Sequence, residues 1–256
     1  MASRISRLAL IAVFFMLAFS ASAFAQWDDE DENPFYFGFE GGFFNRAMWR
    51  GHVLSDSVNF QPNLWLGNGA FEFNTHGYMD LQDVNNQQFE FNRIDLSLEY
   101  KHSFSMLDMS AGGIYYLNPA NNDRNTGEAF VGVGFPSLTF EPSLTMYWDF
   151  QEVEGYYYDL GVEGTLGGTD DIAGMDWNAH LGYSTGGYQN FYFGDATSNF
   201  GAGLNDFRLE ASRKFEFGSW YLKPVAGFSM LIDNEIRDVA ADQDNFWLGV
   251  YAGFEV

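Results

Sequence analysis

The sequence predicts a transmembrane antiparallel up-and-down β-barrel of about 12 strands, and three observations carry this prediction. Apolar and polar residues alternate along about twelve segments between Pro34 and Val256, which is the period of a strand with one dry and one wet face. The N-terminal residues have the pattern of a secretory leader. The exported chain has no cysteine, so it lacks the disulfides of small secreted domains, whereas a closed barrel gains stability by pairing every strand edge.

Residues 1–25 are predicted to be a cleaved signal peptide. Arg4 and Arg7 precede an apolar run over residues 8–19, and residues 23–25 read Ala-Phe-Ala, the small-x-small spacing of a cleavage site. An uncleaved membrane anchor is the alternative, but the run is shorter than the roughly 20 apolar residues that a spanning helix needs. We therefore expect export through the Sec pathway and a mature chain that begins at Gln26.

Residues 26–33 form an acidic tail, and residues 34–256 form the predicted barrel domain. The whole chain carries 12 basic and 35 acidic residues, for a net charge of −23. Without the two arginines of the leader, ten basic and 35 acidic residues remain, for a net charge of −25. Such a surface repels nucleic acid. A cation-favouring interior and the acidic loops of an organism that lives in salt are both open explanations.

The strands follow in order from the alternation and from the turns that separate them. Pro34 opens the first strand, and Asn68-Gly69, the dipeptide of a type I′ hairpin, joins strands at 60–67 and 70–81. Segments 89–101 and 156–166 show the clearest alternation. The other tight turns are predicted near 103–105, 136–137, 167–173 and 217–218, and the long polar loops at 51–58, 82–88, 118–125, 151–154, 186–203 and 232–245.

This order gives twelve strands, with both termini and all five tight turns on one side. The even number fits single-chain bacterial barrels, in which short turns are periplasmic and long loops are external. Ten or fourteen strands remain alternatives, for instance if residues 191–193 form a strand. A soluble β-sandwich is the other alternative, but it would leave the opposite faces of all twelve strands uniformly polar. Aromatic residues, 19% of the chain, gather near the predicted strand ends, as in the interfacial girdles of barrels.

The residues predicted to point into the barrel are those that alternate with the lipid-facing ones. They include most of the basic residues of the chain, and their acidic residues outnumber their basic ones. Two interpretations are open, because a twelve-stranded barrel lies between those filled by side chains and open porins. The charges either brace a packed interior or line a permeation path. The candidate lumen-lining charged residues are Arg46, Arg50, Glu72, Arg93, Asp95, Glu99, Glu163, Arg208 and Glu210.

No catalytic residue is expected, and we expect the protein not to be an enzyme. Residues 182–186 match G-x-S-x-G, but that motif needs a strand, a strained turn and a helix, and here it is predicted to enter a Gly-rich loop. His102 lies close to Ser103 and Ser105, as in barrel hydrolases, yet the three residues are placed at a periplasmic turn. Neither arrangement gives a serine a base on the required side.

No metal site or cofactor is expected either. His76 and His180 have no second histidine at a short chelating spacing, so we interpret them as polar groups of the lumen. The acidic loop at 233–244 lacks the residue order and the central glycine of an EF-hand. Loose binding of Ca²⁺ or Mg²⁺ by the external loops stays open.

Residues 43–51, Phe-Phe-Asn-Arg-Ala-Met-Trp-Arg-Gly, followed by Val-Asn-Phe-Gln-Pro-Asn-Leu at 58–64, resemble the first hairpin of the TorF-type putative porins and related outer-membrane barrels. Segments 181–183, 192–194 and 203–206 are similar as well. The resemblance spans most of the mature chain through loose motifs, implies a porin-like role and supplies no substrate. One departure is the C-terminus, where Phe254 stands two places before the end, although many such barrels end in an aromatic residue that the assembly machinery reads.

We therefore expect a porin-like channel of the cell outer membrane through which small hydrophilic solutes diffuse. Its expected partners are outer-membrane lipid, these solutes and the barrel-assembly machinery. The excess of carboxylates in the lumen predicts weak cation selectivity. The alternative is a structural or adhesive barrel without an open pore, whose external loops, chiefly 186–203 and 232–245, bind partners or ions.

Overall fold

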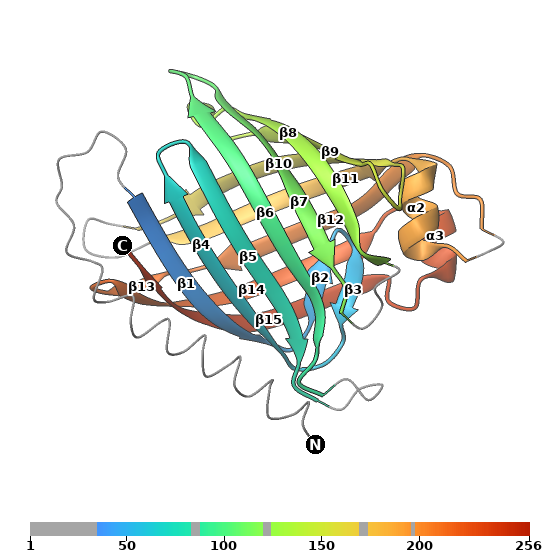
Figure 1. The fold of residues 1–256 in the computed structure, drawn as a ribbon, viewed down its shortest axis with the longest axis horizontal. Helices are drawn as coiled ribbons and strands as arrows, with labels where there is room; N and C mark the ends of the chain where they lie inside the picture. The colour runs from blue at the N-terminus through green and yellow to red at the C-terminus, as the bar shows by residue number, and fades with distance from the viewer. Residues whose placement is uncertain (1–34, 83–87, 120–123, 169–173, 196–197) are drawn as a thin grey trace.

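The computed structural model describes residues 35–82, 88–119, 124–168, 174–195 and 198–256. The predicted signal peptide and acidic tail lie outside these ranges. Twelve antiparallel strands form a closed barrel in which each strand pairs with its neighbours along the chain, and β1 pairs with β15 to close the ring (Figure 1). The barrel strands are β1 (Phe35–Phe44), β4 (Asn59–Asn68), β5 (Phe71–Asp80), β6 (Phe91–Ser103), β7 (Asp108–Leu117), β8 (Thr126–Gly134), β9 (Ser143–Asp149), β10 (Tyr156–Leu166), β11 (Met175–Ser184), β12 (Gly203–Ser212), β14 (Trp220–Leu231) and β15 (Asp244–Glu255).

The fold class and the count of twelve strands are thus confirmed. The remaining described elements belong to the connections between these strands. The short strands β2 (Ala47–Trp49) and β3 (His52–Ser55) pair with each other between β1 and β4. Helix α2 (Gly186–Phe193) follows β11, helix α3 (Asn234–Val239) follows β14, and β13 (Phe215–Phe217) extends the sheet before β14. No helix in the described ranges is long and apolar enough to cross a membrane.

Of the five connections predicted as tight turns, those after β4 and β6 are short, whereas the one between β8 and β9 spans residues 135–142 and most of the fourth lies outside the described residues. The first turn is of a different type from the one predicted. Asn68 pairs with Phe71, so the two central residues of this turn are Gly69 and Ala70. Gly69 has a φ of +57°, whereas Ala70 does not have a positive φ. A glycine with positive φ at the first central position defines a type II′ turn. The prediction of an Asn-Gly type I′ turn was therefore wrong by one residue.

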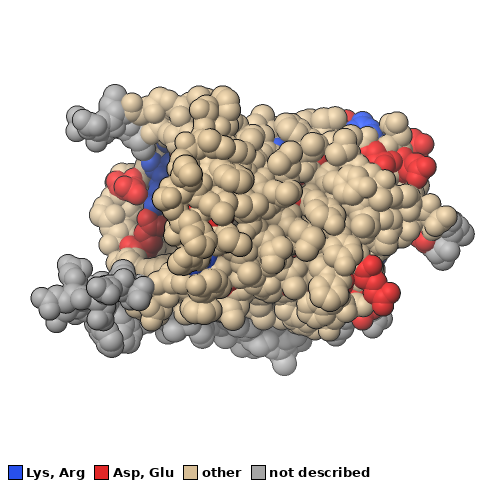
Figure 2. Space-filling view, turned by 90° about the horizontal axis from the view of Figure 1, so that it is seen from above, with Lys and Arg blue, Asp and Glu red and all other residues tan. Residues whose placement is uncertain are grey.

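The outward faces of the strands are apolar and end in two rings of exposed aromatic side chains. Aliphatic residues such as Val131, Leu160 and Val250 lie between the rings. The ring at the turn end includes Phe35, Phe71, Tyr100, Phe104, Phe140, Phe215 and Trp220, and the ring at the loop end includes Phe43, Phe89, Tyr115, Trp148, Tyr156, Tyr183 and Phe246. Figure 2 shows an outer face made almost wholly of uncharged residues, with acidic residues gathered towards its ends. This is the outer surface of an outer-membrane β-barrel.

The inward faces alternate with these apolar ones and carry the buried polar residues, including Glu40, Arg93, Glu128 and Asp149. Large inward side chains fit because small residues lie beside them on the next strand. A Cβ at Gly227 would come within 2.1 Å of the ring of Trp247, its register partner on β15. The interior is therefore filled by polar and aromatic side chains rather than by an aliphatic core.

Candidate functional site

The first long connection of the chain folds into the lumen. Its two strands form a hairpin, here called the lumen hairpin (residues 45–58), that touches strands on several sides of the barrel. The backbone O of Arg50 accepts a hydrogen bond from Asn205 Nδ2 of β12 at 3.0 Å, and Leu54 O accepts one from Asn92 Nδ2 of β6 at 3.0 Å. At the mouth, Arg46 hydrogen-bonds to Asn245 of β15. A segment in contact with β6, β12 and β15 must lie inside the ring.

This placement corrects one prediction, because Arg46 and Arg50 do not belong to the first barrel strand. β1 ends at Phe44, where Asn45 takes over the pairing with β15: its backbone N–H donates to Leu248 O at 3.1 Å, and its Oδ1 accepts from Leu248 N at 2.7 Å. Arg50 lies at the tip of the hairpin with a φ of +48°. The alternation could not reveal the break, since β2 is also a strand and has the same period of two.

Arg50 is the anchor of the lumen hairpin. Its guanidinium forms a bidentate pair with Glu128 of β8, at 2.9 and 3.0 Å, and also donates to Tyr188 Oη at 3.0 Å. The ring centroids of Tyr147 and Tyr157 lie 4.0 and 4.4 Å from the guanidinium carbon. Burial alone would lower the pKa of Arg50, but the Glu128 carboxylate raises it well above its ordinary value, so the side chain stays charged.

A second arginine approaches the hairpin from the barrel wall. Arg93 of β6 pairs with Asp95, with Nε 2.7 Å from Oδ1 and Nη2 donating to Oδ2 at 2.8 Å. Its guanidinium carbon lies 4.1 Å from the ring centroid of Trp49, and that of Arg50 lies 4.7 Å from the same ring. Trp49 therefore makes cation–π contacts with two arginines, an arrangement that holds the hairpin against the wall.

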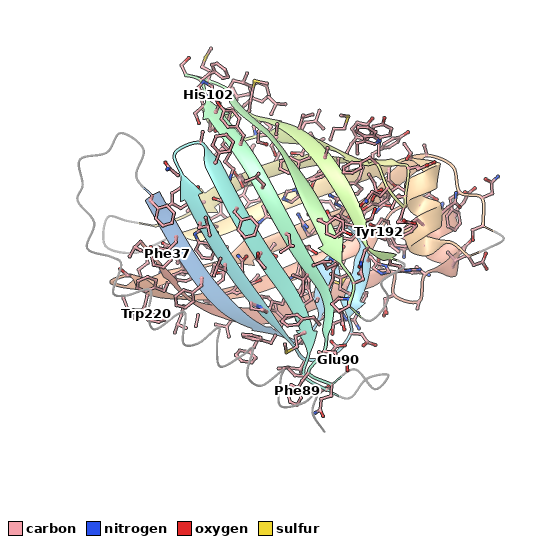
Figure 3. The ribbon with its side chains drawn as sticks, viewed as in Figure 1. Phe37, Phe89, Glu90, His102, Tyr192 and Trp220 are labelled. Atoms are coloured by element: carbon pink, nitrogen blue, oxygen red, sulfur yellow. The ribbon has the colours of Figure 1, made fainter. Side chains whose placement is uncertain are left out.

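Helix α2 covers the hairpin at the loop end. Tyr192 of this helix is labelled in Figure 3. Its ring lies 5.0 Å from that of Trp49, and Tyr188 is fully buried. This helix also corrects the sequence analysis, which placed a Gly-rich loop after the G-x-S-x-G match. The match still gives no nucleophile, because Ser184 is fully buried and its Oγ donates to Asn205 Oδ1 at 3.0 Å.

The lumen at the turn end is open. A cavity of about 290 Å³ lies there. Its lining comes from the neighbouring strands β14, β15, β1, β4 and β5 and from the segment that leads from β12 into β13. We call this part of the barrel the paired wall, because its lysines pair with its carboxylates. Lys223 Nζ lies 3.2 Å from Glu40 Oε2, Lys214 pairs with Glu255, and Lys101 Nζ lies 3.9 Å from Glu72 Oε1. The cavity is lined by Glu40, Asn63, Trp65, Glu72, Asn74, Lys214, Tyr221, Lys223 and Glu255.

A different composition marks strands β10 to β12, here called the acidic wall. Glu163 and Glu210 each lie opposite Asn178 in the strand register, and Asp176 follows on β11. Within the described residues, none of these three carboxylates forms an ion pair, and Asp176 accepts only a hydrogen bond from Thr165. Arg208, on the same wall, forms no ion pair or hydrogen bond with a described residue.

The structure thus separates the nine sequence-predicted site residues into groups. Arg50, Arg93 and Asp95 meet around the lumen hairpin, Glu72 and Glu99 lie near Lys101 at the turn end, Glu163, Arg208 and Glu210 share the acidic wall, and Arg46 stands at the loop-end mouth, 3.6 Å from Asp242. The sequence did not predict the partners Glu128, Trp49 and Tyr188. Their inward or aromatic character was visible, but no local spacing shows that Arg50 pairs with a residue 78 positions away.

Within the part of the chain that the structure describes, no three His, Cys, Asp or Glu side chains gather in a way that could hold a metal ion. His180 instead bonds through Nδ1 to Asp159 Oδ1 at 2.8 Å.

No family model and no curated protein matches the sequence. Solved structures that are similar include the NanC porin, with a TM-score of 0.49 and 8% identity, covering 86% of this chain and 100% of that chain. An outer-membrane channel from Pseudomonas putida F1 gives a TM-score of 0.44 and 10% identity over 90% of this chain and 100% of that one. OmpF of Salmonella typhi gives a TM-score of 0.40 and 7% identity, covering 90% of this chain and 99% of that chain. The TorF-type resemblance remains a prediction.

Proposed function

We propose that the protein is an outer-membrane channel for the diffusion of small hydrophilic solutes, in which the lumen hairpin forms the constriction. The observation that carries the proposal is that a loop, and not the barrel wall, occupies the loop end of the lumen. The hairpin is held by a few polar and cation–π contacts centred on Arg50 and Trp49. The turn end holds a polar cavity. By the usual orientation of such barrels this cavity faces the periplasm.

The distribution of charge supports weak cation selectivity. On the paired wall each lysine neutralises a carboxylate, whereas Glu163, Asp176 and Glu210 on the acidic wall have no basic partner among the described residues. Fixed unpaired carboxylates raise the local concentration of cations. Arg208 weakens this effect, because it places a positive charge on the same wall.

Conductance in a planar lipid bilayer tests the channel function. We expect small, steady currents from the wild type and a several-fold larger conductance when residues 47–55 are replaced by a short Gly-Ser linker. A deletion of residues 238–240, which lie between β14 and β15 and leave Asp242 and its contact with Arg46 in place, serves as the control and should leave conductance near the wild-type value. If neither the wild type nor the hairpin variant conducts, the channel proposal is wrong.

A structural or adhesive barrel is the second candidate, and the buried pair of Arg50 and Glu128 favours it. Such a pair, with both side chains below 8% exposed, would also suit a permanently closed interior. The hairpin replacement separates the two functions, since a permanently closed barrel conducts only after the replacement and not before.

A further inference from the structure

The paired wall has features of a binding subsite beyond a passive vestibule. Its cavity of about 290 Å³ is close to the lower end of ligand pockets, which range from about 300 to 1,000 Å³. It therefore suits a small solute. The cavity combines two aromatic rings, two side-chain amides and carboxylate–lysine pairs contributed by adjacent strands.

The two aromatic rings lie against the barrel wall. A Cβ at Gly38 would be 2.2 Å from Trp65 Cζ2, and one at Gly253 would be 2.3 Å from Tyr221 Cζ. The indole and phenol rings thus take the space that side chains would fill at these two positions. An aromatic ring that rests on backbone on one side turns its opposite face to the lumen, where it offers a flat apolar surface to a solute.

Polar groups with spare hydrogen-bonding capacity lie beside these rings. Asn74 is the direct register partner of Trp65. Neither the amide of Asn74 nor the indole N–H of Trp65 hydrogen-bonds to a described residue. The carboxylate of Glu40 is fixed in place, because it accepts from Tyr221 Oη at 2.6 Å and from Asn63 Nδ2 at 3.3 Å. Fixed acceptors next to free donors suit a solute with several hydroxyl groups, which both donate and accept.

The pairing of the charges decides against a charged ligand. Glu40 pairs with Lys223 and Glu255 with Lys214 within this wall, and Lys101 of the neighbouring strand β6 lies 3.9 Å from Glu72. A cation or an anion would have to compete with these internal pairs, whereas a neutral molecule leaves them intact. We infer that the paired wall binds a small neutral carbohydrate, whose ring face packs on Trp65 while its hydroxyls bond to Asn74 and the neighbouring carboxylates. This inference rests on the proposed channel function, since it names a class of solute.

Titration calorimetry with maltose tests the subsite, on the mature chain folded in a detergent without a sugar headgroup. We expect saturable binding of maltose in the millimolar range and none of arginine or glutamate. Trp65→Ala and, separately, Asn74→Ala should weaken binding at least tenfold, and Trp65→Phe should restore most of it. Trp220→Ala is the control, because Trp220 is exposed in the outer aromatic ring and should not affect binding.

The subsite is overturned if maltose gives no saturable heat with a folded wild type, if arginine or glutamate binds more tightly than maltose, or if Trp65→Ala and Asn74→Ala bind as the wild type does. Because two independent variants are used, a failure of one to fold leaves the other to decide. Conductance is measured on the same preparations. Binding of maltose without conductance would support the subsite and contradict the channel function. Conductance without binding of maltose would support the channel function and contradict the subsite.

Discussion

At the scale of single residues, Arg50 concentrates the interactions that hold the lumen hairpin in place. One guanidinium contacts Glu128, Tyr188 and the rings of Tyr147 and Tyr157. A buried charge pair of this kind contributes little net stability relative to an apolar pair, but the removal of one partner leaves the other charge uncompensated. The hairpin therefore depends on the presence of both members of the pair.

We expect Arg50→Met to destabilise the inserted hairpin by about 3 to 5 kcal/mol, the usual cost of an orphaned buried charge. The double variant Arg50→Met with Glu128→Gln should recover part of that loss, because no charge is then left unpaired. Thermal unfolding in detergent and bilayer conductance measure the two effects. A double variant as unstable as the single one would mean that packing of the arginine, and not charge, holds the hairpin.

His52 makes the inserted hairpin sensitive to acid. Burial, together with the nearby charges of Arg93 and Arg124, lowers the pKa of His52 from 6.5 to about 4. Between these two values the released hairpin binds a proton that the inserted one does not, so the inserted state is fully favoured above about pH 6.5 and loses stability as the pH falls towards 4. The loss is at most about 3 kcal/mol, because one pKa unit corresponds to about 1.36 kcal/mol.

Conductance measured from pH 7 down to pH 4.5 tests this sensitivity. The wild type should open more often as the pH falls, and His52→Gln, which cannot take up a proton, should show a flatter response. Every other titratable group is the same in both proteins, so only the difference between the two profiles reports on His52. Identical pH profiles would remove His52 from the gating.

At the scale of elements, alternation was sufficient to predict the strands but not what happens between them. The clean period of two in β6 and β10 placed both strands correctly. The predicted alternation of short and long connections fails at β9, where the connection before the strand (135–142) is longer than the one after it (150–155). The lumen hairpin was not predicted, because β2 continues the alternation of β1. Helices α2 and α3 escaped because each is less than three turns long, eight and six residues, too short for a helical period to emerge from the sequence.

The two faces of β6 give a matched pair of substitutions. Leu96 pairs with Thr75 and Tyr115 on the outward face, and Ser97 pairs with Asn74 and Ile114 on the inward one. We expect Leu96→Arg to cost roughly 2 to 4 kcal/mol, as for arginine on a lipid-facing site near the bilayer midplane. Ser97→Arg should insert almost normally. The fraction folded into lipid vesicles, read from heat-modifiable migration on gels, measures both, and equal losses would mean that the faces are assigned wrongly.

At the scale of the whole molecule, the strong negative charge of the sequence divides into parts with different consequences. Many acidic residues lie in connections at the loop end, among them Asp233, Glu235 and Asp242. Others are neutralised on the paired wall, whereas Glu163, Asp176 and Glu210 on the acidic wall form no ion pair with a described residue. Composition predicted the excess of acid, but the division between two walls follows from which strands become neighbours when the barrel closes, and no single segment of sequence contains that information.

The division also changes which arginine should control ion selectivity. The sequence alone treats Arg93 and Arg208 as equivalent inward charges. In the structure Arg93 is paired with Asp95 and packed on Trp49, so its removal exposes a carboxylate and loosens the hairpin at once. Arg208 forms no close ion pair with a described residue, but its charge acts on Asp159, Asp206 and Glu210, so its removal should make this wall more negative.

We therefore expect weak cation selectivity in the wild type, stronger selectivity in Arg208→Ala, and weaker selectivity when Glu163→Gln and Glu210→Gln are combined. Reversal potentials across a salt gradient measure the three. The differences should shrink as the screening length falls from about 10 Å at 0.1 M salt to about 3 Å at 1 M, because the carboxylates act on ions in a water-filled lumen. An anion-selective wild type would show that permeating ions do not follow the acidic wall, and a selectivity unchanged by salt would place the selecting charges in a dry constriction instead, where screening by mobile ions is weak.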